Sequence, residues 1–146
     1  MSAPTAPTAP ATPALNGQII GRAHYATRAV LERRLERLGL TFPQSLAVGA
    51  LAAGDKNRDQ VIVQLTSSLK IARADAEAVV DSLPATGLVE SSTLALTDAG
   101  RSFHAEIAAE TVKILDLLYA DLPADELAVA ARILITLTER ANAELA

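Results

Sequence analysis

The chain has 146 residues, of which 50% are hydrophobic, 21% are charged and only 3% are aromatic. This composition suits a single domain with a core of mostly aliphatic side chains. The absence of cysteine excludes a disulfide framework and a thiolate metal site. The sequence shows neither a secretory signal pattern nor an apolar run near the roughly 20 residues that span a bilayer, so we expect a cytoplasmic protein.

The formal net charge is −4, and the charges are unevenly distributed. Residues 15–40 carry five basic and two acidic side chains, residues 55–101 carry five and seven, and residues 102–146 carry three and eight. Contacts with nucleic-acid phosphates need lysine and arginine. The acidic balance beyond residue 40 is therefore unusual for a DNA-binding protein.

In residues 1–13 a proline recurs at every third position, at Pro4, Pro7, Pro10 and Pro13. This spacing among alanine and threonine favours an extended, polyproline-like chain that cannot build a core. We expect a disordered tail. A ligand for a proline-recognising domain is the alternative.

The first helix is predicted over residues 15–38, where apolar side chains recur at helical spacing and Gly39 follows as a stop. Thr41 then opens a second helix. Gln44 stands three residues later, as a capping box requires, and Pro43 is tolerated in the first turn.

A third, short helix is predicted with Asp59 as its N-terminal cap. It ends at a turn near Leu69 and Lys70, and a fourth helix follows over residues 72–83. Pro84 ends this helix, because proline lacks an N–H group and clashes with the preceding turn.

Two short strand patterns, residues 88–89 and 93–96, are the only convincing β-strand signals in the sequence. Ser91 and Ser92 would join them as a minimal hairpin. Thr97 is placed to cap the helix that follows.

The two last helices are long. The first is predicted over residues 98–120, and Asp121 and Pro123 mark the break after it. Asp125 and Glu126 favour the N-terminus of the last helix through the helix dipole.

The segment from Gly87 to Arg101 carries a recognisable combination of residues. Gly87-Leu88-Val89-Glu90, a short gap, and then Leu96-Thr97 with Gly100-Arg101 resemble the MarR family of bacterial transcription regulators. The resemblance covers residues 15–146. Matching apolar positions of the helix-turn-helix are Leu65, Leu69, Ile71, Val79 and Leu83.

The resemblance implies a mainly α winged helix-turn-helix fold, with about six helices and a very short β-hairpin wing. Residues 14–146 would form one domain, with a helix-turn-helix lobe at about 41–97 and dimerisation helices at about 15–38 and 98–145. Members of the family are homodimers that place their lobes in successive major grooves. Many release DNA when a small phenolic or anionic molecule binds between lobe and dimer core. A homodimer is also expected physically, because wide apolar faces on the outer helices would otherwise meet water.

Five basic side chains are the candidates for DNA contact: Lys56, Arg58, Lys70, Arg73 and Arg101. Each is equally well interpreted as an ordinary solvated charge. The predicted helix over residues 72–83 would be the one that reads the major groove. It departs from the family, because Asp75 and Glu77 lie where phosphates would approach, although both also suit a helix N-terminus. The expected wing also departs from it. A two-residue loop reaches only about 3.5 Å per residue, and the arginine that enters the minor groove in the family is missing.

Candidate ligand-binding residues are His24, Tyr25 and Arg28. Arg28 follows His24 by one helical turn, so both can face one cavity and bind an anionic effector. The alternative is that His24 and His104 have structural roles. We expect no metal and no cofactor, because the ligand spacing of a zinc site is missing, and no enzyme, because no catalytic motif is present.

The sequence therefore predicts a homodimeric, DNA-binding transcriptional regulator of MarR type that responds to a small anionic or aromatic effector. The alternative is a dimer of the same fold that has lost DNA binding. Such a dimer would serve as a ligand-binding or protein-interaction module.

Overall fold

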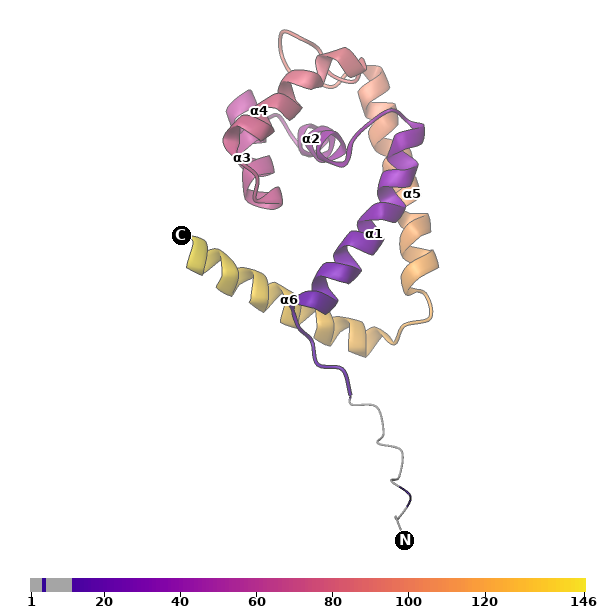
Figure 1. Ribbon diagram of the computed structural model, residues 1–146. Helices are drawn as coiled ribbons and strands as arrows, with labels where there is room; N and C mark the ends of the chain where they lie inside the picture. Colours follow the sequence, from indigo (N-terminus) through magenta and orange to yellow (C-terminus); the bar gives the residue numbers. More distant parts are fainter. Residues whose placement is uncertain (1–3, 5–11) are drawn as a thin grey trace.

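The computed structural model describes residue 4 and residues 12–146, so most of the tail predicted at residues 1–13 lies outside the described residues. The described chain is mainly helical (Figure 1), which confirms the predicted fold class. A short 3₁₀ turn, η1, covers Pro84–Thr86. The α-helices are α1 (Gly17–Arg37), α2 (Phe42–Ala52), α3 (Arg58–Leu69), α4 (Arg73–Ser82), α5 (Asp98–Tyr119) and α6 (Ala124–Leu145).

The helices form two regions (Figure 1). α2, α3 and α4 pack together in a lobe, residues 41–97, while α1 and α5 lie side by side as a long pair next to it. α6 turns back across the N-terminal end of α1, away from the packed part of the lobe. It has no buried residue and packs closely against no other described helix.

Side-chain caps fix where the lobe helices begin. The predicted capping box of α2 is confirmed, since the Gln44 amide donates to the Thr41 hydroxyl at 3.3 Å and the Gln44 side chain accepts from the Thr41 amide at 3.0 Å. The prediction that Asp59 caps α3 is wrong. Asn57 is the cap, because it forms the same reciprocal pair with Gln60, at 2.9 Å in both directions. Asp59 lies in the first turn instead, where its carboxylate favours the helix dipole.

The wing is smaller than predicted. Its pairing is a single antiparallel bridge between Val89 and Leu96. The Glu90 amide donates to the Ala95 carbonyl at 2.9 Å and the Leu94 amide to the Glu90 carbonyl at 3.2 Å, so the loop has four residues, Ser91–Leu94.

The predicted two-residue loop and the strand at Thr93 are therefore wrong. Two-residue hairpin loops need a positive φ at their first central residue. Among the described residues of this loop, only Leu94 has a positive φ, of 57°. The chain therefore reverses over Ser91–Leu94, and not over Ser91 and Ser92 alone.

The core lies in the lobe, with α1 and α5 attached to it. Leu35 of α1 is fully buried and Phe103 of α5 is 7% exposed, and both belong to the same apolar cluster as the lobe helices. This cluster holds α1 and α5 to the lobe at one end only. Leu40, just before the lobe, also belongs to the cluster. The lobe contributes buried Ala47, Val48, Val61, Ile62, Leu65, Ala76, Val80, Leu83, Leu88 and Val89.

The start of α5 is held directly on the wing. Thr97 caps the helix as predicted, accepting from the Gly100 amide at 3.0 Å and donating to the Gly87 carbonyl at 2.7 Å. The Thr97 amide donates to the Leu88 carbonyl at 3.0 Å. A Cβ atom at Gly100 would overlap that same Leu88 carbonyl oxygen. A glycine is therefore required at position 100, because the backbone of α5 lies directly against the backbone of the wing at Leu88.

The substitution Gly100→Ala tests this close approach. It is expected to destabilise the protein by about 1–3 kcal/mol, since overpacking against backbone cannot relax by side-chain rotation. Thermal and urea unfolding at fixed protein concentration would measure the change.

The matched control is Gly49→Ala in α2, where a Cβ meets no atom within 4 Å. This change should stabilise by about 0.5–1 kcal/mol, because alanine is the better helix former. Equal stability of the Gly100→Ala variant and the wild type would contradict the assigned role of Gly100.

Candidate functional site

α4 occupies the position of a reading helix. It follows α3 after the short turn Lys70–Ala72, in which Lys70 has a left-handed backbone with φ of 55°. Ala76 and Val80 bury one side of α4 against the lobe. The outer side exposes Arg73, Ala74, Asp75, Ala78 and Asp81.

Arg73 is held by two carboxylates. Its guanidinium donates to Asp59 at 2.8 Å and to Glu77 at 2.9 Å. These hydrogen bonds, first to Asp59 and then to Glu77, raise the pKa of Arg73 above its ordinary value. The Arg73 side chain is 55% exposed, so it is not buried against the lobe. Its guanidinium is nevertheless already paired with the carboxylates of Asp59 and Glu77.

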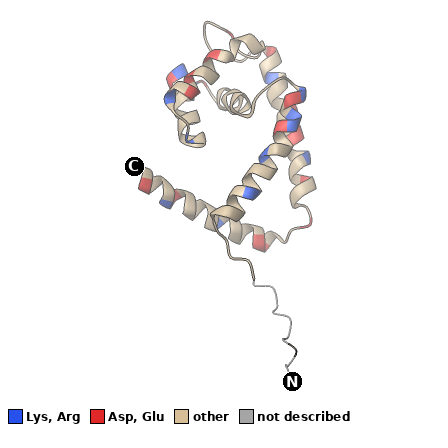
Figure 2. Cartoon of the chain, viewed as in Figure 1, with Lys and Arg blue, Asp and Glu red and all other residues tan. Residues whose placement is uncertain are grey.

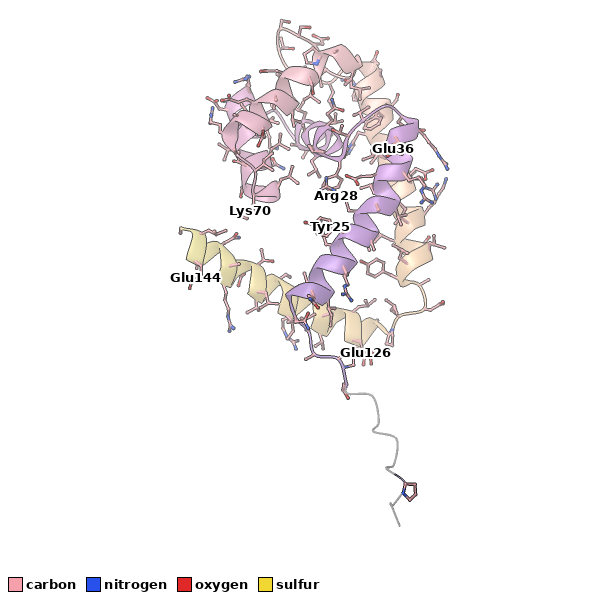
Figure 3. The ribbon with its side chains drawn as sticks, in the orientation of Figure 1. Tyr25, Arg28, Glu36, Lys70, Glu126 and Glu144 are labelled. Atoms are coloured by element: carbon pink, nitrogen blue, oxygen red, sulfur yellow. The ribbon has the colours of Figure 1, made fainter. Side chains whose placement is uncertain are left out.

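Arg58 is engaged in the same way. Its guanidinium contacts Asp81 at 3.0 Å, so ion pairs tie the N-terminus of α3 to both ends of α4. Acidic and basic residues are interleaved on α3 and α4 and form no stripe of one sign (Figure 2). Lys70 lies at the end of α3 on the edge of the lobe (Figure 3), and no ion pair is recorded for it among the described residues.

Lys56 and Arg101 lie elsewhere. The Lys56 ammonium donates to the Ala50 carbonyl at 3.0 Å, and Arg101 donates to the Leu96 carbonyl at 3.0 Å and to Asp98. Both line a cleft at the base of the wing, together with His104. The five predicted DNA contacts therefore divide into three on α3, its C-terminal turn and α4, and two in this cleft.

A second, smaller cavity lies between α1, α2 and α5. It measures about 220 Å³, and we call it the inner cavity. Its lining residues are His24, Thr27, Arg28, Leu31, Phe42, Thr111, Ile114 and Leu115.

The structure brings two of the three predicted ligand-binding residues to the inner cavity. His24 and Arg28 line it, whereas Tyr25 is 70% exposed and is not among the lining residues. Figure 3 shows Tyr25 projecting from α1 separately from Arg28. The Tyr25 ring contacts the His24 ring edge-on, with centroids 5.3 Å apart.

Arg28 is positioned by neighbours that the sequence analysis did not identify. Its Nε atom donates to Glu32 at 2.8 Å, and its guanidinium lies 4.3 Å from the centre of the Phe42 ring. Glu32 follows Arg28 by one helical turn, so this ion pair can be predicted from the sequence. Phe42 belongs to another helix, and no pattern in the sequence pairs it with Arg28.

The described residues hold neither a metal-binding cluster nor a membrane-spanning helix. No group of three or more His, Asp or Glu side chains there could hold a metal ion. No helix in the described part of the chain is long and apolar enough to cross a membrane.

The sequence matches no protein-family model and no curated protein. Its structure is similar to a MarR protein from Peptoclostridium difficile, with a TM-score of 0.72, 16% identity, and 92% of this chain and 96% of that chain covered. It is also similar to a MarR-family transcriptional regulator from Silicibacter pomeroyi, with a TM-score of 0.62, 21% identity, and 82% and 84% of the two chains covered. The chain has the MarR fold.

A further similar structure is CouR from Rhodococcus jostii RHA1, which is bound to p-coumaroyl-CoA. Its TM-score is 0.68 at 15% identity, with 84% of this chain and 90% of that chain covered. The likeness to the MarR fold therefore extends over most of each chain. At these identities it establishes the fold and leaves the activity to the chemistry of this chain's own residues.

Proposed function

We propose that the chain is a homodimeric transcriptional regulator of MarR type that binds double-stranded DNA through α4. The observation that carries the proposal is the helix-turn-helix geometry within a MarR fold. α4 is buried along one side and presents the other to solvent. In helix-turn-helix proteins this outward helix enters the major groove.

The distribution of exposed apolar side chains supports a homodimer. Every large hydrophobic side chain of the described residues that is exposed lies on α1, α5, α6 or the segments beside them, except Val63. α6 alone exposes Val129, Ile133, Leu134, Ile135, Leu137 and Leu145. Monomeric proteins rarely expose apolar surface of this extent. A two-fold pairing of these helices buries it.

Sedimentation should therefore give a mass near twice the 15.2 kDa of one chain. The substitution Ile133→Asp is expected to raise the dimer dissociation constant by about tenfold or more, because it places an unpaired carboxylate on the apolar face of α6. Analytical ultracentrifugation over a concentration series measures both quantities.

The matched control is Asn142→Asp, which adds the same charge to α6 at a position that is already polar. It should leave the dissociation constant nearly unchanged. A monomeric wild type at high concentration would rule out the dimer.

The charges around α4 limit how strongly it can bind DNA. Arg58, Lys70 and Arg73 supply three positive charges, while Asp59, Asp75, Glu77 and Asp81 supply four negative ones. Exposed ion pairs of this kind are weak, so a phosphate can displace the carboxylate from either arginine. The displaced carboxylates would still repel the phosphate backbone of DNA. We therefore expect modest affinity and a shallow dependence on salt.

The same observations favour a second candidate, in which α4 does not bind DNA. Both arginines on this face already have carboxylate partners, and the four-residue loop of the wing has no basic residue. The dimer would then serve as a ligand-binding or protein-interaction module.

The two candidates differ in their response to the carboxylates that hold Arg73. With DNA from upstream of the protein's own gene at roughly 50 mM salt, Asp59→Asn combined with Glu77→Gln should tighten binding several-fold. The double substitution frees Arg73 and removes two repulsive charges. Arg73→Ala should weaken binding. Fluorescence anisotropy against salt concentration measures both effects.

Asp125→Asn combined with Glu126→Gln removes the same charge at the start of α6, and Figure 3 shows Glu126 far from the lobe. This control separates a local effect from a change in net charge. Absence of binding at low salt by the wild type and by the Asp59→Asn, Glu77→Gln variant would leave the second candidate.

We also propose that the inner cavity receives a small aromatic or aliphatic anion as effector. Arg28 uses only Nε in its recorded hydrogen bond to Glu32, so its terminal nitrogens keep their donors for a carboxylate. Phe42, Leu31, Ile114 and Leu115 supply apolar walls. The cavity touches α2 of the lobe and both long helices. A ligand in the cavity would therefore change the orientation of the lobe relative to the long helices. This change would alter the distance between the two lobes of the dimer, which must match about 34–36 Å on DNA.

Benzoate is a probe small enough for this cavity. The imidazole NMR signals of His24 are expected to shift on titration of the wild type. Measured by isothermal titration calorimetry, His24→Ala or Arg28→Ala should weaken binding about tenfold through loss of a charged or polar contact. Arg22→Ala on the same helix is the control. Unchanged benzoate affinity in both variants would remove His24 and Arg28 from the ligand site.

A further inference from the structure

A larger cavity than the inner cavity lies apart from it and from the α4 face. It measures about 730 Å³, within the range of pockets that hold small organic ligands. It lies between the end of α2, the loop before α3, the wing and the first turns of α5, and we call it the wing-base cleft. Its lining is Leu51, Ala52, Gly54, Asp55, Lys56, Asn57, Thr93, Leu94, Ala95, Leu96, Arg101 and His104.

Hydrogen-bond donors are in excess in the wing-base cleft. Lys56 has three N–H donors and uses one on the Ala50 carbonyl, while Arg101 has five and uses two, on the Leu96 carbonyl and Asp98. His104 adds its ring and has no recorded hydrogen bond among the described residues. Asp55 is the only carboxylate in the lining. The remaining donors suit an anion.

The rest of the lining is largely apolar. Leu51, Leu94 and Leu96 are all half-buried and pack against the lobe core from the side of the cleft. An inorganic ion would use the basic groups and leave these walls unused. Apolar walls beside convergent donors are typical of sites for organic anions, in which the body of the ligand buries apolar surface and the charged end sets its orientation.

The cleft also contains a strained residue. Leu94 has a φ of 57°, in the left-handed region that disfavours residues other than glycine. Such conformations persist only where the surroundings fix them, and they concentrate at functional sites. Here the Glu90–Ala95 and Leu94–Glu90 hydrogen bonds fix the backbone. The Leu94 side chain forms part of the cleft wall.

The two sides of the cleft are fixed before any ligand arrives. Gly100 and Thr97 hold the start of α5 on the wing, which places Arg101 and His104 on one side. The Ala50 carbonyl holds the Lys56 ammonium on the other side. Preorganised donors bind more tightly because less side-chain freedom is lost on binding.

We propose that the wing-base cleft binds a small organic anion, a carboxylate or a phosphate monoester with an apolar body. Lys56, Arg101 and His104 contact the charged group, and Leu51, Leu94 and Leu96 contact the body. This site shares no lining residue with the inner cavity. The proposed ligand binding does not depend on the proposed DNA binding by α4, so either proposal can be disproved without the other.

The chain has only two histidines, His24 and His104, which gives one reporter in each site. Titration of the full-length protein with hexanoate, followed by imidazole NMR, is expected to shift the His104 signals in a saturable way. Hexanol, which has the same apolar body without the charge, should bind at least about tenfold more weakly. Acetate, which has the charge without the body, should also bind more weakly.

Arg101→Gln and Lys56→Gln should each weaken hexanoate binding about tenfold, as expected for loss of a charged hydrogen bond. Lys113→Gln, farther along α5 and outside the cleft, is the matched control and should leave binding unchanged. Circular dichroism establishes that each variant is folded. Two variants on opposite sides of the cleft keep the test decisive if one of them unfolds.

Three outcomes would overturn the proposal. One is a His104 signal that does not move up to high hexanoate concentration. Another is equal affinity for hexanol and hexanoate, which would indicate apolar binding alone. The third is a His104 signal that moves with a DNA duplex and not with hexanoate, which would assign Lys56 and Arg101 to DNA, as the sequence alone suggested.

Discussion

The aliphatic core of the lobe is the interaction on which the rest of the structure depends. Val61, Leu65, Val80 and Leu83 are almost completely buried, which fixes α4 against α3 within one chain. The long helices join this core chiefly through Leu35 and Phe103. The lobe is therefore complete in the monomer, whereas the apolar faces of α5 and α6 are not covered. This division separates a compact helix-turn-helix unit from a framework that the proposed homodimer would complete with a second copy.

Local residue patterns were enough to predict the order of the helices and most of their boundaries. The Thr41–Gln44 pair and the Thr97 cap act within one turn, so their spacing in the sequence is also their spacing in space. Asn57 and Asp59 are both good caps by type. The choice between them depends on Gln60, which returns a hydrogen bond to Asn57. The position of the wing turn was missed because Leu94 adopts a conformation that its residue type disfavours.

The basic residues of the candidate sites are identifiable by type, but their partners on other elements are not. Arg58 pairs with a residue 23 positions away, and Arg73 pairs with one 14 positions away as well as with Glu77 one helical turn on. Local spacing reveals only the Arg73–Glu77 pair. The wing-base cleft likewise joins Lys56 to Arg101 and His104 through the packing of α5 on the wing. Such neighbours follow from the tertiary fold, which local periodicity does not encode.

The pairing of charges on α4 also bears on how the proposed regulator would respond to an effector. A DNA-binding surface with many unpaired lysines and arginines is attracted to any phosphate backbone, and that attraction tolerates an imperfect fit. Around α4 the carboxylates largely offset Arg58 of α3 and Arg73 of α4. Binding would then depend on how well two lobes match two grooves at once. Because little general attraction remains to compensate for a misplaced lobe, a small change where α2 meets α1 and α5 would be enough to release the DNA.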